Sequence, residues 1–347
     1  MSLVLDAAAR RIPRKRADDG AFAPAVARLR ALCADDLERV DAELLDCLAS
    51  PVAMIPELGG HLVGAGGKRL RPLLTLSAAA MLGYEGRNHV RLAAAVELIH
   101  GATLLHDDVV DESALRRGAS TANVLWGNKE SVLVGDFIFS RSFELMVATG
   151  DLEVLKILSR AAGIIAEGEV LQLGTQKNVD TDFDTYLAVV DAKTAALFAA
   201  ASEVGAVIAK AAPATVAAMR DYGRNLGLAY QLVDDALDYS GDEGALGKSV
   251  GDDFREGKMT LPVVYALAEA TQEERAFWVR TIGRGEHGDD DFAAALDIMD
   301  RRGVIDRTLE TARGYADAAM ATLSAAPQSE YADALHEIAR QSIERAY

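Results

Sequence analysis

Apolar residues recur at three- and four-residue spacing along most of the chain, which is the period of a helix that buries one face. The pattern is clear from about Ala25 to Leu48, from Leu70 to Leu82 and from Val90 to Val110. Alanine dominates the apolar residues, and aromatic and β-branched runs are sparse, so helix propensity is high nearly everywhere. We therefore expect an all-α protein with little or no sheet.

Short turn-like segments separate the helical stretches. They lie at Gly83 to Asn88, Gly127-Asn128, Gly150-Asp151 and Gly174 to Asp184. An acidic stretch from Gly283 to Asp291 predicts a loop between late helices. No fixed-period repeat, low-complexity block or linker divides the chain, so we expect helices packed side by side in one domain.

The first twenty residues are basic and lack the apolar stretch of a signal peptide. Their cations are Arg10, Arg11, Arg14, Lys15 and Arg16. A flexible, solvated tail over residues 1–20, followed by one domain over residues 21–347, is the preferred interpretation. An organelle-type presequence is the alternative.

Composition limits the function classes. The net charge of -17 argues against a general nucleic-acid binder, because such a protein needs a basic surface to displace counterions. Charges such as Glu203 and Lys210 interrupt the longest apolar stretches, so we expect no transmembrane segment. Cys33 and Cys47 match neither a disulfide framework nor a metal-ligand spacing, which favours a soluble protein of the reducing cytoplasm.

Two acidic motifs are the main candidates for chemistry. The first, LLHDDVVDE, places Asp107 and Asp111 four residues apart on one helix face, with Asp108 beside them. The second, YQLVDDALDYSGD, repeats the spacing; its carboxylates are Asp234, Asp235 and Asp238. A single motif of this kind is often only a solvated helix end, but two matched copies indicate a site. Carboxylates repel each other at this spacing, so a cation should compensate.

The carboxylates predict a magnesium site. Magnesium binds one or two carboxylates together with substrate phosphates, so two facing motifs suit a diphosphate held through Mg²⁺. An EF-hand calcium loop does not fit, because it needs ligands at alternating positions and a central glycine.

Basic residues stand near both motifs. Lys68, Arg69 and Arg71 follow paired glycines in GAGGKRLRP, which is not a Walker A sequence because Leu62 stands where the first glycine is required. Further cations follow the two acidic motifs; these are Arg116, Arg117, Lys248 and Lys258. Each alone is more often a solvated surface residue, but together they predict a site for two diphosphates.

From about Gly66 to Pro262 the motif set resembles the trans-isoprenyl diphosphate synthases. GGKRLRP, HDDVVD with a trailing RRG, and YQLVDDALDY followed by GKSVGDDFREGKMTLP stand in the order of that family. The resemblance implies a single-domain antiparallel helical bundle of the isoprenoid synthase type around a central cavity. It also implies head-to-tail condensation of isopentenyl diphosphate onto an allylic diphosphate, expected to be farnesyl diphosphate.

The same resemblance implies roles for individual residues. Asp107, Asp111, Asp234 and Asp238 are the expected magnesium-linked carboxylates, supported by Asp108 and Asp235. The expected isopentenyl diphosphate contacts are Lys68, Arg71, His100 and Arg117. The expected allylic-side residues are Arg116, Lys193, Thr194, Gln231, Lys248 and Lys258, of which Lys193, Thr194 and Gln231 also present dipoles to the allylic cation. For His100 a satisfied core side chain is the alternative.

Product length is expected to depend on Ala102 and Thr103, one turn before Asp107, where the family places the floor of the hydrocarbon pocket. Neither is aromatic, and neither is Ile99 or Ala95 farther down, so we expect a long product. Octaprenyl, nonaprenyl and decaprenyl stay open. Octaprenyl for a quinone side chain is preferred, a geranylgeranyl or other shorter product is the alternative, and the family's habit predicts a homodimer.

Three other interpretations are weaker. A class I terpene cyclase needs no isopentenyl site, so GGKRLRP and RRG argue against it. A non-catalytic partner subunit often lacks one acidic motif, whereas both are intact here. A structural helical scaffold leaves the matched acidic and basic residues unexplained.

Overall fold

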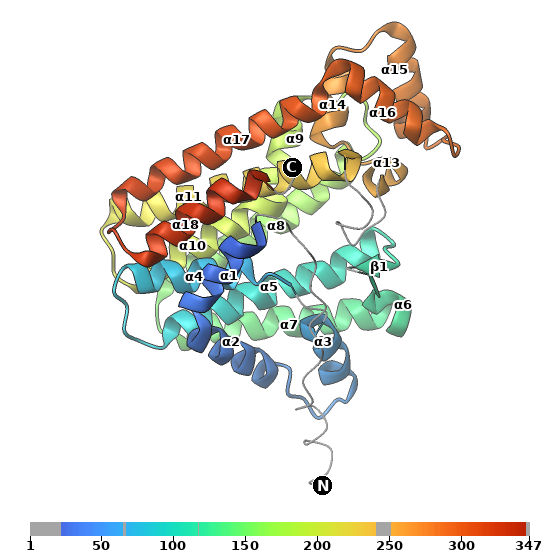
Figure 1. The fold of residues 1–347 in the computed structure, drawn as a ribbon. Helices are drawn as coiled ribbons and strands as arrows, with labels where there is room; N and C mark the ends of the chain where they lie inside the picture. The colour runs from blue at the N-terminus through green and yellow to red at the C-terminus, as the bar shows by residue number, and fades with distance from the viewer. Residues whose placement is uncertain (1–21, 65–66, 117, 241–250, 345–347) are drawn as a thin grey trace.

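The computed structural model describes residues 22–64, 67–116, 118–240 and 251–344, and over these the protein is a bundle of helices (Figure 1). The first part contains α1 (Phe22–Leu32), α2 (Ala34–Cys47), α3 (Met54–Gly64), α4 (Leu70–Met81), α5 (Asn88–Val110), α6 (Ala122–Trp126), α7 (Asn128–Ala148), α8 (Leu152–Thr175), α9 (Phe183–Val190), the π-helix η1 (Asp191–Ala195), α10 (Ala196–Ile208) and α11 (Pro213–Ser240). The second part contains α13 (Asp252–Glu256), α14 (Leu261–Ala268), α15 (Gln272–Trp278), the π-helix η2 (Val279–Gly283), α16 (Asp291–Arg302), α17 (Val304–Thr322), the 3-10 helix η3 (Leu323–Ala325) and α18 (Glu330–Ile343).

The all-α prediction is confirmed. Strand is limited, in the described residues, to an antiparallel pair of two-residue strands, β1 (Leu115–Arg116) and β2 (Ala119–Ser120). The expected helix over Ala25 to Leu48 is divided at Cys33 into α1 and α2, while the other two stretches correspond to α4 and α5. The expected late loop lies between η2 and α16. The tail over residues 1–20 lies outside the described residues.

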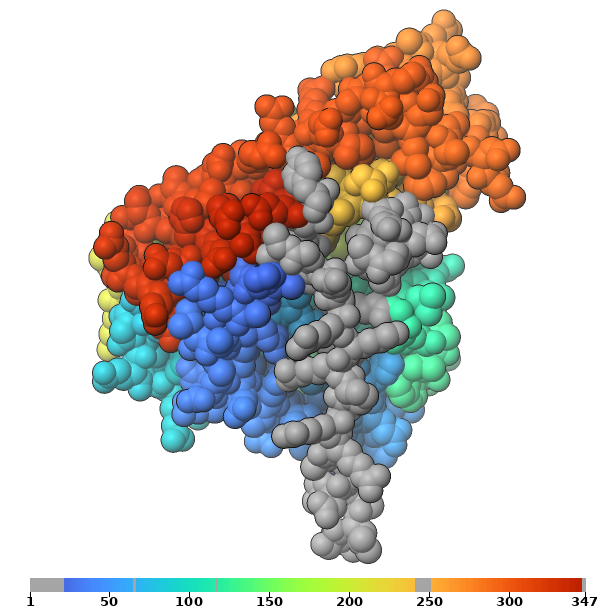
Figure 2. All heavy atoms as spheres, in the orientation of Figure 1, coloured from blue at the N-terminus to red at the C-terminus, as the bar shows by residue number. Residues whose placement is uncertain are grey.

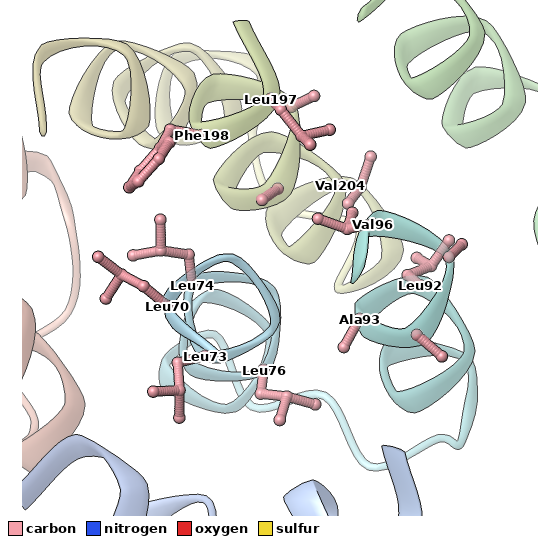
Figure 3. Close-up of a cluster of buried hydrophobic side chains, with 14 of the residues drawn as sticks. Leu70, Leu73, Leu74, Leu76, Leu92, Ala93, Val96, Leu197, Phe198 and Val204 are labelled. Atoms are coloured by element: carbon pink, nitrogen blue, oxygen red, sulfur yellow. The ribbon is translucent and has the colours of Figure 1, made fainter. Parts of the chain in front are cut away.

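Helix α5 is buried on nearly all sides, which is why its apolar residues show no single face. Ala93, Ala94 and Ala95 in succession are fully buried. Three successive buried positions point in three directions around a helix, so neighbours must enclose α5. Figure 3 shows the packing of α4, α5 and α10 around one part of this core, with these side chains labelled: Leu70, Leu73, Leu74, Leu76, Leu92, Ala93, Val96, Leu197, Phe198 and Val204.

Helices α4 and α10 approach closely at Gly205. A Cβ atom built there would lie 2.5 Å from the Thr75 carbonyl oxygen, which real Cβ atoms essentially never do. The same contact is reinforced by the Thr75 hydroxyl, which donates to the Ala201 carbonyl at 2.8 Å. A residue without a side chain therefore permits the separation at which the core is packed.

A second hydrophobic cluster lies among the late helices, α14 to α17, part of which extends beyond the body of the molecule in Figures 1 and 2. Helix α11 contributes to both clusters, with Tyr222 and Leu226 in the first and Leu232 and Val233 in the second. It therefore ties the late helices to the main bundle. None of the described helices combines the length and the apolarity needed to span a bilayer.

Candidate active site

The two acidic motifs lie at the C-terminal ends of α5 and α11, and the fold brings these ends together. Lys258 Nζ lies 3.5 Å from Asp111 Oδ2 of the first motif and 3.9 Å from Asp253 Oδ1. The Asp253 N–H in turn donates to Asp238 Oδ2 of the second motif at 3.1 Å. One lysine and one short helix terminus thus join the motifs, which supports the expectation that they face each other.

Asp108, the middle carboxylate of the first motif, is directed into protein. It is 3 % exposed, and Arg116 donates to its Oδ1 through Nε at 2.9 Å and Nη2 at 2.7 Å. Asn123 donates to its main-chain carbonyl at 3.0 Å. Arg116, expected on the allylic side, therefore joins strand β1 to the motif.

Asp235, the middle carboxylate of the second motif, is also buried and receives three hydrogen bonds. Its Oδ2 accepts from the Tyr186 hydroxyl at 2.6 Å and from the Leu261 N–H at 3.2 Å. Its Oδ1 accepts from Gln231 Nε2 at 2.9 Å, and Gln231 Oε1 accepts from the Thr194 hydroxyl at 3.0 Å. A continuous network therefore orients Gln231 and Thr194, two of the expected catalytic residues.

Lys193, the third of these residues, lies between two carboxylates. Its Nζ is 2.8 Å from Glu169 Oε2 on α8 and 3.9 Å from Asp107 Oδ2 on α5. Burial raises the pKa of Asp107 to about 7, Lys193 opposes this rise and Glu169 adds to it. Lys193 and Thr194 both stand on the π-helix η1, whose widened turn is a feature common at functional sites.

The basic turn before α4 directs its cations to different places. Arg69 has a left-handed backbone, with φ of 50°, and its Nη1 donates to Glu97 Oε1 at 2.5 Å. Arg69 Nη2 also donates to the Val63 carbonyl at 3.3 Å. Arg69 is therefore an anchor of the turn, which leaves Lys68 and Arg71 as its candidate ligand contacts.

Lys68 and Arg71 lie over aromatic rings. Lys68 Nζ is 4.9 Å from the centroid of the Phe22 ring, and the Arg71 guanidinium carbon is 4.5 Å from that of Phe198. Arg71 Nη1 is also 3.1 Å from His100 Nε2, so the structure joins His100 to the basic group. Such cation–π contacts hold a charge in place without neutralising it.

The surroundings of Lys258 keep its side chain protonated. Burial alone would lower its pKa, but Asp253, Asp111 and Glu256 outweigh burial and raise it above the ordinary value. Arg117 and Lys248, the remaining expected cations, lie outside the described residues.

The expected chain-length residues lie one turn before Asp107 on α5. Ala102 is buried, and the half-buried Thr103 donates its hydroxyl to the His100 carbonyl at 2.8 Å. Farther down the same helix, Ile99 and Ala95 are buried as well. The side chains of Ala102 and Ala95 therefore lie on the same side of a helix enclosed by the bundle.

The donor atoms of the motifs suit a hard divalent cation. Among the described residues, no group of three or more His, Cys, Asp or Glu side chains is arranged to hold a metal ion. The outer aspartates of both motifs nevertheless supply only carboxylate oxygens, the donors of Mg²⁺ and Ca²⁺. This donor set fits ions that take part of their coordination from substrate phosphates.

Comparison with known proteins decides the family. Residues 52–299, which include the basic turn and both acidic motifs, match the family model of polyprenyl synthetases. The chain belongs to the polyprenyl synthetase family. It is 44% identical over 318 residues to an octaprenyl diphosphate synthase of Escherichia coli, which covers 92% of this chain and 98% of that protein.

Solved structures of polyprenyl synthases agree with this assignment. A decaprenyl diphosphate synthase from Rhodobacter capsulatus superposes with a TM-score of 0.90 at 50% identity, covering 93% of this chain and 99% of that chain. A polyprenyl synthase from Caulobacter crescentus, solved with calcium and isoprenyl diphosphate, has the same TM-score and identity and covers 96% and 100% of the two chains. The isoprenoid-synthase fold expected from the motifs is thereby confirmed.

Sequence reasoning missed several residues of the polyprenyl synthetase site. Asp253 belongs to the same GDDFREGK segment as Lys258, so the prediction of Lys258 as a site residue could also have pointed to Asp253. Glu169 and Tyr186 gave no local signal, because each is a single polar residue in a helix that meets the motifs only in the folded protein.

The state of Asp235 depends on its donors. Burial raises its pKa to about 7 and Asp253 adds to the rise, while the hydrogen bonds that it accepts oppose it. In the unfolded chain the pKa of an aspartate is about 3.9. The raised pKa contributes its full stabilisation of the folded protein below a pH of about 3.9, and this stabilisation is lost as the pH rises through about 7.

Replacement of Tyr186 by Phe should therefore destabilise the protein more above pH 7 than below it. At pH 8 the ionised Asp235 loses a donor, at a cost of about 1.5–3 kcal/mol in unfolding free energy, and the cost should shrink at pH 5.5. Urea unfolding at both pH values measures this difference.

Tyr222→Phe is the matched control, because the buried Tyr222 donates to the neutral Leu335 carbonyl at 2.7 Å. Its cost should be about 1 kcal/mol at both pH values. An equal pH dependence for the two variants would contradict the role assigned to Tyr186.

Proposed function

We propose that this protein is a long-chain all-trans polyprenyl diphosphate synthase, which adds isopentenyl diphosphate units head-to-tail to an allylic diphosphate. The observation that carries the proposal is a site with two separate parts. Two acidic motifs joined by Lys258 form one part, and the basic turn with Lys68 and Arg71 forms the other. A terpene cyclase needs only the first part, and a scaffold needs neither.

We assign the allylic diphosphate to the acidic part. Asp107, Asp111, Asp234 and Asp238 are the proposed carboxylate ligands of Mg²⁺, which when bound supplies the positive charge that stabilises the departing diphosphate. Lys193 and Lys258 lie beside Asp107 and Asp111, which supports their proposed role as contacts of the phosphate oxygens. The calcium and isoprenyl diphosphate bound to the Caulobacter crescentus relative support the assignment.

The middle aspartates have a different proposed role. Asp108 is engaged by Arg116, and Asp235 by three donors, so their contacts favour orientation of the motifs over metal binding. Asp235 in particular fixes the side chains of Gln231 and Thr194.

We assign isopentenyl diphosphate to the basic part. Arg71 offers a planar donor pair for phosphate oxygens, and Lys68 offers a point charge. The contact of His100 with Arg71 supports its proposed place in the same group. Arg117, in the segment that follows the first motif, is proposed for the same substrate on the resemblance of its RRG motif alone.

These residues support a reaction without a protein nucleophile. The bond between the allylic carbon and the diphosphate oxygen breaks, and its electron pair leaves with the diphosphate, which the cations stabilise. The isopentenyl double bond then forms the new carbon–carbon bond to the allylic cation. Thr194 and Gln231 are proposed to stabilise this cation with their side-chain dipoles, and the departing diphosphate accepts the proton that the new product loses.

The first test is the product ladder. Purified protein incubated with Mg²⁺, farnesyl diphosphate and labelled isopentenyl diphosphate should form products that end at about eight to ten isoprene units, because no aromatic side chain blocks the helix face below Asp107. Chromatography of the dephosphorylated products measures chain length. Chelation by EDTA should abolish elongation, and added Mg²⁺ should restore it.

No elongation with any allylic primer would contradict the proposal and favour the cyclase or partner-subunit alternatives. Products of four or fewer isoprene units would favour the shorter-chain alternative. Such a chain has about 20 carbons or fewer and is too short to pass far below Ala102.

We infer an octaprenyl product for quinone side chains, with decaprenyl as the alternative. The octaprenyl diphosphate synthase of Escherichia coli and the decaprenyl diphosphate synthase of Rhodobacter capsulatus both support a long chain. The growing chain is proposed to pass Ala102 and Thr103 and continue toward Ile99 and Ala95, along the side of α5 that these residues share.

Substitutions along α5 should shorten the product according to depth. Ala102→Phe should stop elongation earlier than Ala95→Phe, because seven residues of helix separate the two rings by about 10 Å. The product ladder measures the longest chain for each variant, and thermal unfolding checks that each is folded. Identical product lengths in both variants and the parent protein would show that the floor lies elsewhere.

We also propose that two copies of the chain form a dimer through α6, α7 and α8. Large apolar side chains are exposed on these three consecutive helices, and exposed apolar surface of this kind is favourable to bury in a protein interface. They are Val124, Leu125, Val132, Leu133, Val147, Leu152, Val170, Leu171 and Leu173.

Leu133→Glu should convert the proposed dimer to a monomer, because a carboxylate would be buried without a partner at the interface. Light scattering coupled to gel filtration measures the mass. Leu45→Glu on α2, also a highly exposed leucine, is the control and should leave the mass unchanged. A parent protein that is monomeric at micromolar concentration would contradict the proposal.

A further inference from the structure

Helix α1 contacts the side chain of Lys68 through its first residue. The Phe22 ring is fully buried, and Lys68 Nζ lies 4.9 Å from its centroid. The Tyr230 ring on α11 lies 6.2 Å from the Phe22 ring and 5.8 Å from the same ammonium. Two rings from distant parts of the chain therefore bound the position of one cation, each within the range of a cation–π attraction.

The same helix also holds the main chain of Lys68. Arg30 Nη1 donates to the Lys68 carbonyl at 3.3 Å. Phe22 and Arg30 are eight residues apart, about two turns, so they lie on the same face of α1. One face of one helix thus fixes both the backbone and the ammonium group of Lys68.

The basic turn requires such support from outside. Gly67 and Arg69, on either side of Lys68, have φ angles of 150° and 50°, which most residues avoid. A left-handed arginine persists only where its surroundings hold it. Arg69 is held by α5 through Glu97, and Lys68 is held by α1, so two helices constrain consecutive residues of the turn.

Helix α1 is in turn positioned by the C-terminal helix. Arg28 pairs with Glu337 on α18 at 3.0 Å, and the Tyr331 hydroxyl donates to the Leu32 carbonyl at 3.2 Å. Figure 2 shows the N-terminal helices, in blue, in contact with the C-terminal helices, in red. Both lie outside residues 52–299, the part of the chain that the polyprenyl synthetase family model matches.

We propose that α1 is a positioning element of the isopentenyl diphosphate site, in which Phe22 and Arg30 hold Lys68 in place for the substrate phosphate. This inference rests on the proposed function of Lys68. Phe22 and Arg30 do not touch the substrate themselves; they act through Lys68.

The test compares Phe22→Leu and Arg30→Met with the parent protein. Phe22→Leu should raise the KM for isopentenyl diphosphate about three- to tenfold, as expected for loss of one partly desolvated cation–π contact. Arg30→Met should raise it in the same direction. The KM for the allylic diphosphate should stay within about twofold, because Lys68 belongs to the other part of the site.

Matched variants separate positioning from stability. Val26→Ala removes buried apolar volume from α1, and Val26 makes none of the described contacts with Lys68. This variant should leave the KM for isopentenyl diphosphate unchanged. Phe22→Tyr retains the ring and should restore most of the affinity lost in Phe22→Leu, and thermal unfolding reports the stability of every variant.

A second readout is independent of turnover. Calorimetric binding of inorganic pyrophosphate to the metal-free protein should weaken in Phe22→Leu and in Lys68→Met, and the double variant should bind no more weakly than Lys68→Met alone. An unchanged KM in Phe22→Leu, equal rises in both KM values, or additive losses in the double variant would overturn the inference. Failure of the parent protein to elongate any primer would overturn the proposed function instead, and the pyrophosphate titration would then decide the inference.

Discussion

Repulsion among carboxylates at one end of the bundle is the constraint on which the rest of the site depends. The ends of α5 and α11 bring two aspartate motifs together, and Asp253 and Glu169 add further negative charge. Like charges in a partly buried site destabilise the folded state unless cations or protons offset them. Lys193, Lys258 and Arg116 provide part of this compensation. The pKa of Asp107 is nevertheless raised, mainly by burial, with Glu169 and Asp111 adding to the rise.

The negative charge of the outer aspartates underlies the proposed metal site. A group of carboxylates attracts divalent cations, which can take the rest of their coordination from a diphosphate. The middle aspartates, Asp108 and Asp235, are instead engaged by donors of the protein itself. These contacts fix the orientation of the two motifs.

Much of this arrangement follows from local sequence. Helices α4 and α5 and the late loop are predictable, because period, turn residues and propensity act over a few residues. The spacing of the aspartates likewise predicts which of them share a helix face. The break at Cys33 is not predictable in this way, since the apolar period continues through it and tertiary packing decides where the helix divides.

The contacts that orient the site are not predictable from local sequence. Tyr186 is 49 residues from Asp235 and Glu169 is 24 residues from Lys193, so only the packing of α8, α9 and α11 brings them together. The π-helix at Lys193 and Thr194 also lacks a sequence signature here. The contact of Phe22 with Lys68 is equally unpredictable, because an apolar residue in a helix indicates a core position and not a contact with a charged group.

Helix α11 passes from one hydrophobic cluster to the other and carries the second acidic motif where its side chains enter the late cluster. Leu232, Val233 and Ala236 surround the motif residues in sequence and pack beneath the late helices. The two halves of the chain are therefore not interchangeable modules. A recombinant that took only its late helices from a relative would change the side chains that pack against the second acidic motif. We therefore expect α11 and the helices packed on it to be inherited together.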